Sequence, residues 1–301
     1  MADAYTQFFS TYKAEPGFNK EHETGVLESY LQGNSTATEA AEQITAQASD
    51  RRQPPNNRVG KIWNLLLACA EEVPNAQPQI LNLFNAIFSL PKPEGKNGWD
   101  VDWSNEKQRE GLSWTLEGLH SCMFLAFPGS EIGKMVGLTM MMKALKSNIQ
   151  EKSSSSASGV SLKDRWANFH AFTARAESVG IMYSNITWAI PLIVSTLEKK
   201  VATKDTKSKQ VVSLETNVPA ATNWLIFASE ELLMGADKIE KGCFEGSEYG
   251  EWKGAGFSRE RWSFWKQRLE ELATSELLSE EAKEAVRKAA VSMAKAERVK
   301  K

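Results

Sequence analysis

The sequence predicts an all-α fold, an irregular multi-helix bundle of antiparallel helical hairpins that together form a single large domain. Apolar residues recur along almost the whole chain at the i, i+3, i+4, i+7 spacing of one helix face. No segment of strand length alternates convincingly between apolar and polar side chains. The 301 residues are 42% hydrophobic and 25% charged, which is typical of a globular protein with a buried core.

The first strongly periodic segment covers residues 59–73 and ends at Pro74, because proline cannot continue a helix that precedes it. A second periodic run over 80–88 ends at Pro91, so the two segments should form a helical hairpin. Two further helices are expected over 112–127 and 132–145.

The second half continues in helices. A face with Trp166, His170 and Thr173 is followed by an apolar run over 186–197, in which Pro191 predicts a kink or a break. Residues 199–210 form a polar connector. Pro219 should then lie near the first turn of the next helix, where proline is favoured.

The last two helices have clear start signals. Ser258 should cap a helix with a buried stripe of Trp262, Trp265, Leu269 and Leu272. Ser279, followed by two glutamates, should cap the final helix. The helical domain is placed over 25–299 after an N-terminal segment of residues 1–24. The Ser-rich stretch 152–160 is either a flexible surface loop or a domain boundary.

Charge and cysteine content restrict the class of protein. A net charge of −2 provides no basic field for a nucleic acid partner. We expect no membrane partner, because no apolar run approaches the roughly 18 residues of a membrane span and the start lacks a leader pattern. Three cysteines, two of them in apolar runs, fit a reducing compartment. The expectation is a cytoplasmic protein, with the nucleus as the alternative; the oligomeric state is not predicted.

Four segments carry a resemblance to a known family: IWNLLLACAEEVP at 62–74, WANFHAFTARAESVGI at 166–181, VPAATNWLIFASEEL at 218–232 and GFSRERWSFWKQRLEELA at 256–273. Together with the Trp-bearing loop 99–103 they resemble the fungal family called domain of unknown function 3632, over about residues 25–295. The resemblance implies an all-helical intracellular protein of fungal origin, and it brings no catalytic residues with it.

The chain contains ten tryptophans, spaced from Trp63 to Trp265. They fit a ring-rich core whose indole N–H groups have partners. The alternative is an aromatic groove for a ligand, lined by residues that combine ring faces with a guanidinium group: Trp114, Trp166, Trp224, Trp262, Trp265 and Arg261.

Two histidines are candidates for acid–base chemistry. His120 lies three residues after Glu117 on a predicted helix, a spacing at which the carboxylate can orient the imidazole. His170 shares a helix face with Trp166. For each histidine the alternative is a hydrogen-bonded core residue.

No cofactor and no metal are expected. The chain lacks the phosphate-binding, dinucleotide-binding, zinc-protease and hydrolase motifs. Asp100, Asp102 and Glu106 are close in sequence, but their loop spacing does not place carboxylates one turn apart on a helix, which favours a solvated loop over a Mg²⁺ site.

Two functional hypotheses remain. The first is a binding or interaction protein with a Trp-rich groove for a small apolar or aromatic molecule or for a partner helix. The second is a cofactor-independent enzyme of fungal secondary metabolism, an isomerase or cyclase in which His120 or His170 serves as acid or base within an aromatic pocket.

Overall fold

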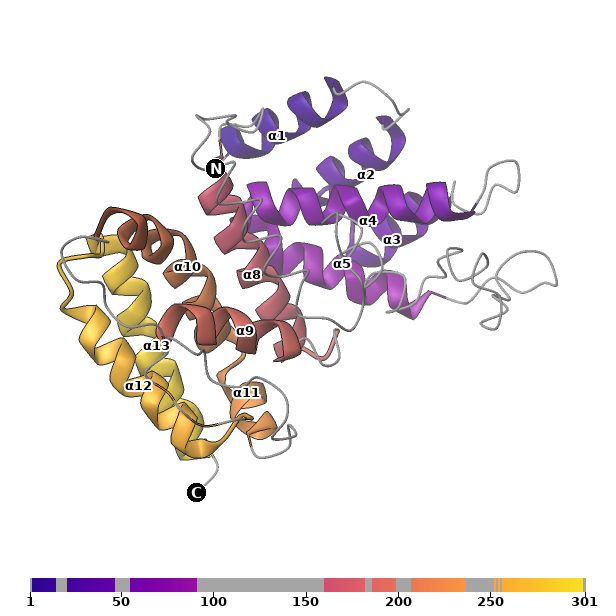
Figure 1. The fold of residues 1–301 in the computed structure, drawn as a ribbon. Helices are drawn as coiled ribbons and strands as arrows, with labels where there is room; N and C mark the ends of the chain where they lie inside the picture. Colours follow the sequence, from indigo (N-terminus) through magenta and orange to yellow (C-terminus); the bar gives the residue numbers. More distant parts are fainter. Residues whose placement is uncertain are drawn as a thin grey trace. The chain divides into compact units, whose positions relative to one another are not determined.

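The computed structural model describes residues 2–14, 21–46, 55–90, 160–181, 186–198, 207–236, 252, 254 and 256–299. Within these ranges the secondary structure is helical, and no strand occurs (Figure 1). The all-α prediction is confirmed. The helices expected over 112–127 and 132–145 and the Ser-rich stretch 152–160 lie outside the described residues.

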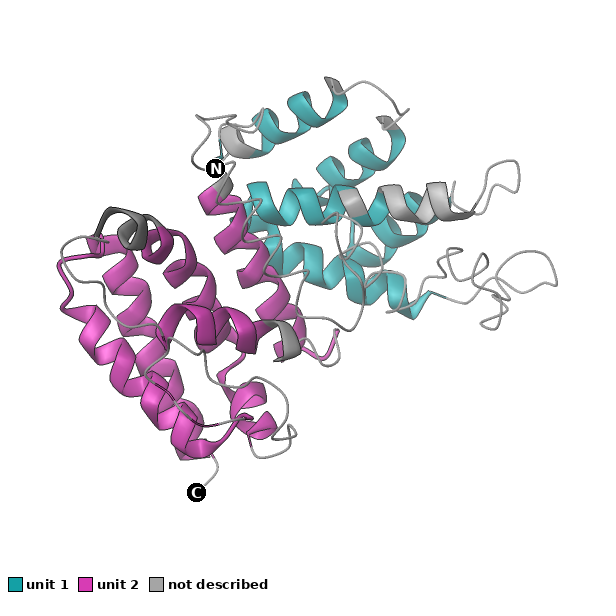
Figure 2. Cartoon of the chain, in the orientation of Figure 1, with its two compact units in different colours: residues 1–162 teal, residues 163–301 magenta. Residues whose placement is uncertain are grey.

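The chain divides into two compact units, residues 1–162 and 163–301 (Figure 2). The division falls just after the Ser-rich stretch that the sequence marked as a loop or boundary. One domain over 25–299, and the antiparallel arrangement of its hairpins, stay predictions.

The first unit contains α1 (Ala2–Ala14), α2 (Glu21–Leu31), α3 (Ala37–Ala46), α4 (Pro55–Glu72), the short 3₁₀ helix η2 (Pro74–Ala76) and α5 (Gln77–Ser89). Helix α4 ends just before Pro74 and α5 ends just before Pro91, as the sequence predicted. Trp63 of α4 stacks on Phe84 of α5 with ring centroids 5.0 Å apart. Helix α2 extends across residue 24, so the boundary of the expected N-terminal segment falls inside a helix.

The second unit contains α8 (Leu162–Ser178), α9 (Ile186–Leu197), α10 (Lys207–Phe227), α11 (Ser229–Gly235), α12 (Arg259–Ala273) and α13 (Glu280–Val299). Helix α13 packs against α10, α11 and α12 (Figure 1). The predicted stripe of α12 is confirmed, since Trp262, Trp265, Leu269 and Leu272 are all buried. Ser258 caps this helix by accepting a hydrogen bond from the backbone N–H of Arg261 at 3.3 Å.

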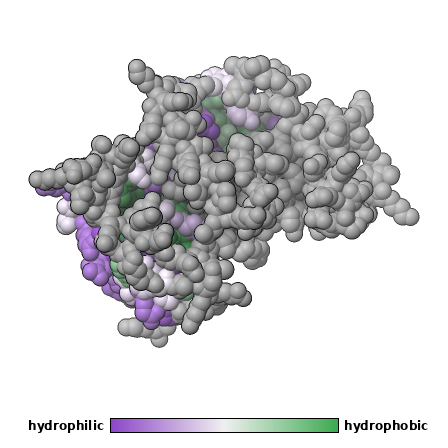
Figure 3. Space-filling view, viewed as in Figure 1, coloured by the Kyte–Doolittle hydropathy of each residue, from purple (hydrophilic) through white to green (hydrophobic). Residues whose placement is uncertain are grey.

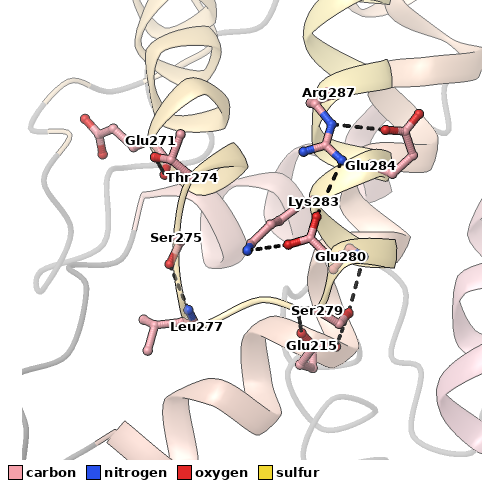
Figure 4. A network of polar contacts seen from close by, with 11 residues as sticks. Glu215, Glu271, Thr274, Ser275, Leu277, Ser279, Glu280, Lys283, Glu284 and Arg287 are labelled. Carbon is pink, nitrogen blue, oxygen red and sulfur yellow. Dashed lines mark hydrogen bonds and ion pairs between the residues drawn. The ribbon is translucent and has the colours of Figure 1, made fainter.

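Helix α13 begins in a polar network that joins it to α10 (Figure 4). Ser279 is the predicted cap, because its hydroxyl accepts a hydrogen bond from the N–H of Ala282 at 3.3 Å. The carboxylate of Glu215 accepts hydrogen bonds from the N–H of Ser279 at 2.5 Å and from Lys163 Nζ at 3.1 Å. Burial alone would raise the pKa of Glu215, but these hydrogen bonds, together with the positive charge of Lys163, hold it below its ordinary value.

Two expectations about helix ends are wrong. Helix α10 begins at Lys207, so residues 207–210 are helical rather than part of the connector, and Pro219 lies in the helix interior. Interior proline costs about 3 kcal/mol. Burial of neighbouring side chains offsets this cost, since Val218 and Trp224 are fully buried. Helix α9 continues through Pro191, which excludes a break there, while the kink that the sequence allowed stays a prediction.

The outer side of α12 and α13 is hydrophilic in Figure 3. Within the described part of the chain, the exposed large hydrophobic residues are Val179, Met234, Val291 and Val299. None of the described helices is both long and apolar enough to cross a membrane.

Candidate functional site

The candidate site is an aromatic cluster around His170, which lies on α8 and is 1% exposed. The indole Nε1–H of Trp224, on α10, donates a hydrogen bond to His170 Nδ1 at 2.9 Å. Two further side-chain contacts on either side of this hydrogen bond join α10 to α8. Asn223 Nδ2 donates to the carbonyl oxygen of Ala167 at 2.8 Å, and the guanidinium carbon of Arg175 lies 3.7 Å from the ring centroid of Phe227.

The hydrogen bond from Trp224 determines which nitrogen of His170 carries the proton. An indole N–H can only donate, so Nδ1 must be the acceptor, and in a neutral imidazole the proton is then on Nε2. Burial lowers the pKa of His170 from 6.5 to about 3, which makes the ring neutral at physiological pH. His170 therefore presents an N–H donor, and its buried Nε2 atom has no hydrogen-bond partner among the residues that the structure describes.

Trp166 provides a second donor of the same kind. It lies one helical turn before His170 on α8, and the two rings meet edge to face with centroids 4.2 Å apart. Its Nε1–H is also buried and finds no acceptor within the described ranges, and the residue is 3% exposed. The ring of Phe169 contacts the same imidazole, with centroids 5.4 Å apart.

The structure thus brings three of the predicted site residues together: Trp166, His170 and Trp224. A buried donor without an acceptor costs about 1–3 kcal/mol, and native proteins contain few of them. Two such donors lie here on adjacent, contacting rings, and neither has an acceptor among the residues that the structure describes. An oxygen with lone pairs is the chemical group that this cluster can bind.

A second group of predicted residues forms a closed ion-pair network. Arg261 and Glu198 are fully buried, with Arg261 Nε 2.6 Å and Nη2 2.9 Å from the two carboxylate oxygens. Trp265 Nε1–H donates to the same carboxylate at 2.7 Å. Arg261 also donates to the carbonyl oxygen of Gly256. Because these groups satisfy one another, their geometry fits the core alternative.

Trp262 is tied into α13 in a similar way. Its Nε1–H donates to Glu297 Oε1 at 3.1 Å, and Lys266 Nζ donates to the other oxygen of that carboxylate at 2.8 Å. The ligand-binding role of Arg261, Trp262 and Trp265 stays a prediction that no contact here supports.

Glu198 is the residue that sequence reasoning missed. It lies between the apolar run 186–197 and the polar connector predicted over 199–210, and the sequence alone assigned it no role. However, Glu198 lies at i+4 and i+8 from Val194 and Ile190, so the helical period already places it on their face. Its N–H donates to the carbonyl oxygen of Val194 at 3.1 Å, which continues that period.

The remaining candidates, His120, Glu117 and Trp114, lie outside the described residues, as do Asp100, Asp102 and Glu106. Within the described ranges, no group of three or more His, Cys, Asp or Glu side chains could hold a metal ion.

The described residues thus belong to an all-helical protein whose second unit contains a buried aromatic cluster with unpaired N–H donors. The family model described as "Protein of unknown function (DUF3632)" matches residues 63–269, which is more than half of the chain. The chain therefore belongs to this family, and the resemblance found in the sequence is confirmed. No curated protein and no solved structure matches it.

Proposed function

We propose that this chain is a small-molecule-binding protein whose ligand occupies the cluster of Trp166, His170 and Trp224. The observation that carries the proposal is the pair of buried N–H donors without acceptors, Trp166 Nε1–H and His170 Nε2–H. A ligand that accepts from both would remove two desolvation penalties, each of about 1–3 kcal/mol.

A binding role is favoured over acid–base catalysis by the state of His170. A general base needs a free lone pair and a pKa near the working pH. Here Nδ1 already accepts from Trp224, and the pKa of about 3 keeps the ring neutral. A small molecule is favoured over a partner helix because the described surface exposes few large hydrophobic side chains.

Burial also defines how a ligand must enter. His170 and Trp166 are 1% and 3% exposed, so the side chains that cover the cluster have to move before the donors can be reached. Association should therefore be slower than at an open site, with a rate constant of roughly 10⁴ M⁻¹s⁻¹ or less, because binding requires a conformational change.

Native mass spectrometry of the full chain purified from its own host tests the proposal. Comparison of gentle with denaturing conditions should reveal a non-covalent companion of definite mass. The companion should be lost in Trp166→Phe, which removes one donor, and retained in Trp262→Phe, a matched buried tryptophan that bonds to Glu297. Far-UV circular dichroism shows that both variants are folded. Equal masses under the two conditions for the unmodified chain contradict the proposal.

A further inference from the structure

We infer that the group recognised by Trp166 and His170 is an uncharged carbonyl oxygen on an otherwise apolar molecule. This inference rests on the proposed function and specifies the chemical class of its ligand. It follows from the hydrogen-bonding capacity of the two side chains, from the uncharged partner of His170, and from the rings around them.

The two donors, Trp166 Nε1–H and His170 Nε2–H, require a ligand group that accepts hydrogen bonds and has no donor of its own. Trp166 offers only an indole N–H, and His170 offers only Nε2–H because Trp224 occupies its other nitrogen. A carbonyl oxygen has two lone pairs and can accept from both. A hydroxyl group would add a third O–H that itself needs a buried acceptor, and an ammonium group would present only donors.

The charge state of the cluster favours a neutral group over a carboxylate. The hydrogen-bond partner of His170 is Trp224, which is uncharged. Arg175 is on the same helix; its guanidinium group lies over the ring of Phe227, and its Nε is also buried without a partner among the described residues. A carboxylate transferred into this site would lose its hydration without a paired cation, which costs several kcal/mol more than burial of a neutral carbonyl.

The surrounding side chains determine the body of the ligand. The rings of Trp166, Phe169 and Trp224 contact or approach the imidazole, with centroids 4.2, 5.4 and 6.2 Å from it. Aromatic faces and edges pack best against planar or apolar groups. A ketone, ester or tertiary amide on an aromatic or aliphatic frame satisfies all three conditions.

Three probes of similar size separate these requirements: acetophenone carries the carbonyl, isopropylbenzene has the same shape without oxygen, and benzoate carries the charge. Binding to the ¹⁵N-labelled full chain is followed by nuclear magnetic resonance of the ring N–H groups. The signals of Trp166 and Trp224 are assigned from Trp166→Phe and Trp224→Phe. The signal of His170 Nε2–H is assigned from His170→Phe.

Acetophenone should shift the N–H signals of Trp166 and His170 saturably, and bind roughly tenfold more tightly than either other probe, since one or two hydrogen bonds distinguish them. Trp166→Phe should weaken acetophenone roughly tenfold, whereas Trp262→Phe should leave its affinity unchanged.

Two results would overturn the inference. In the first, acetophenone and isopropylbenzene bind equally well and neither N–H signal shifts. The site is then apolar and does not use the donors, so the carbonyl assignment is wrong while the proposed binding function still holds. If acetophenone does not bind, the carbonyl assignment is wrong. The proposed function is tested separately by native mass spectrometry, which detects a non-covalent companion whatever its chemical class.

Discussion

Breaking the buried ion pair between Glu198 and Arg261 should destabilise the second unit more than any surface change. The carboxylate accepts three hydrogen bonds, two from Arg261 at 2.6 and 2.9 Å and one from Trp265 at 2.7 Å, and both charged side chains are 0% exposed. Removal of one partner leaves the other charge buried and unpaired. The expected loss is about 3–5 kcal/mol of unfolding free energy for Arg261→Met, and about the same for Glu198→Gln.

The variant that combines Glu198→Gln with Arg261→Met provides the sharper measurement, because it removes both charges at once. It should lose no more stability than either single variant, which corresponds to a coupling energy of about 3 kcal/mol. Lys266→Met is the matched control on the same helix, since Lys266 pairs with Glu297 at 2.8 Å and the two side chains are 31% and 35% exposed. This exposed pair should contribute at most about 1 kcal/mol.

Equilibrium urea unfolding, followed by circular dichroism at the helical bands and by tryptophan fluorescence, measures these free energies. Where Arg261→Met does not fold, Glu198→Gln keeps the shape of the side chain and still reports the loss of charge. A loss below about 1 kcal/mol in Glu198→Gln would refute the desolvated pair, because a solvated pair is worth no more than that.

Three further outcomes are expected from the same unfolding assay. The pKa of His170 is near 6.5 in the unfolded chain and about 3 in the folded protein. The unfolding free energy of the second unit should therefore fall by roughly 1 kcal/mol per pH unit as the pH drops below 6.5, and His170→Gln should abolish this dependence. Trp224→Phe should cost at least about 1 kcal/mol more than Trp166→Phe, because it leaves His170 Nδ1 unpaired whereas Trp166→Phe removes an unpaired donor. Glu215→Gln should cost about 1 kcal/mol at pH 7, because the lowered pKa of Glu215 stabilises the fold while the carboxyl is ionised. This cost should shrink progressively in acid, as the pH falls from the ordinary glutamate value through the lowered pKa, and an unchanged cost in strong acid contradicts it.

Local features of this fold were predictable from the sequence. Ser258 and Ser279 cap helices because a hydroxyl next to a helical period accepts a backbone N–H, which is a property of three or four neighbouring residues. The shared face of Trp166 and His170 follows from their i, i+4 spacing. Such features depend on the helical period alone.

Long-range pairing was not predictable in the same way. Trp224 meets His170 across 54 residues of sequence, and Glu198 meets Arg261 across 63. Helical periodicity states which face a residue occupies, but not which other face it meets. Pro219 was misplaced for a related reason, since the burial of Val218 and Trp224 outweighs a local preference for the first turn.

The two polar networks of the second unit differ in how completely their groups are paired. Around Glu198, each charged group and the indole N–H of Trp265 find partners at hydrogen-bonding distance, so the network is complete without any addition. Around His170, Trp224 satisfies one nitrogen and thereby fixes the other as a donor, which faces no acceptor. A phenylalanine at position 166 would fill most of the same space without an unpaired N–H. An incomplete network is worse for stability than an apolar one, and the proposed ligand would supply the acceptor that Trp166 and His170 lack among the described residues.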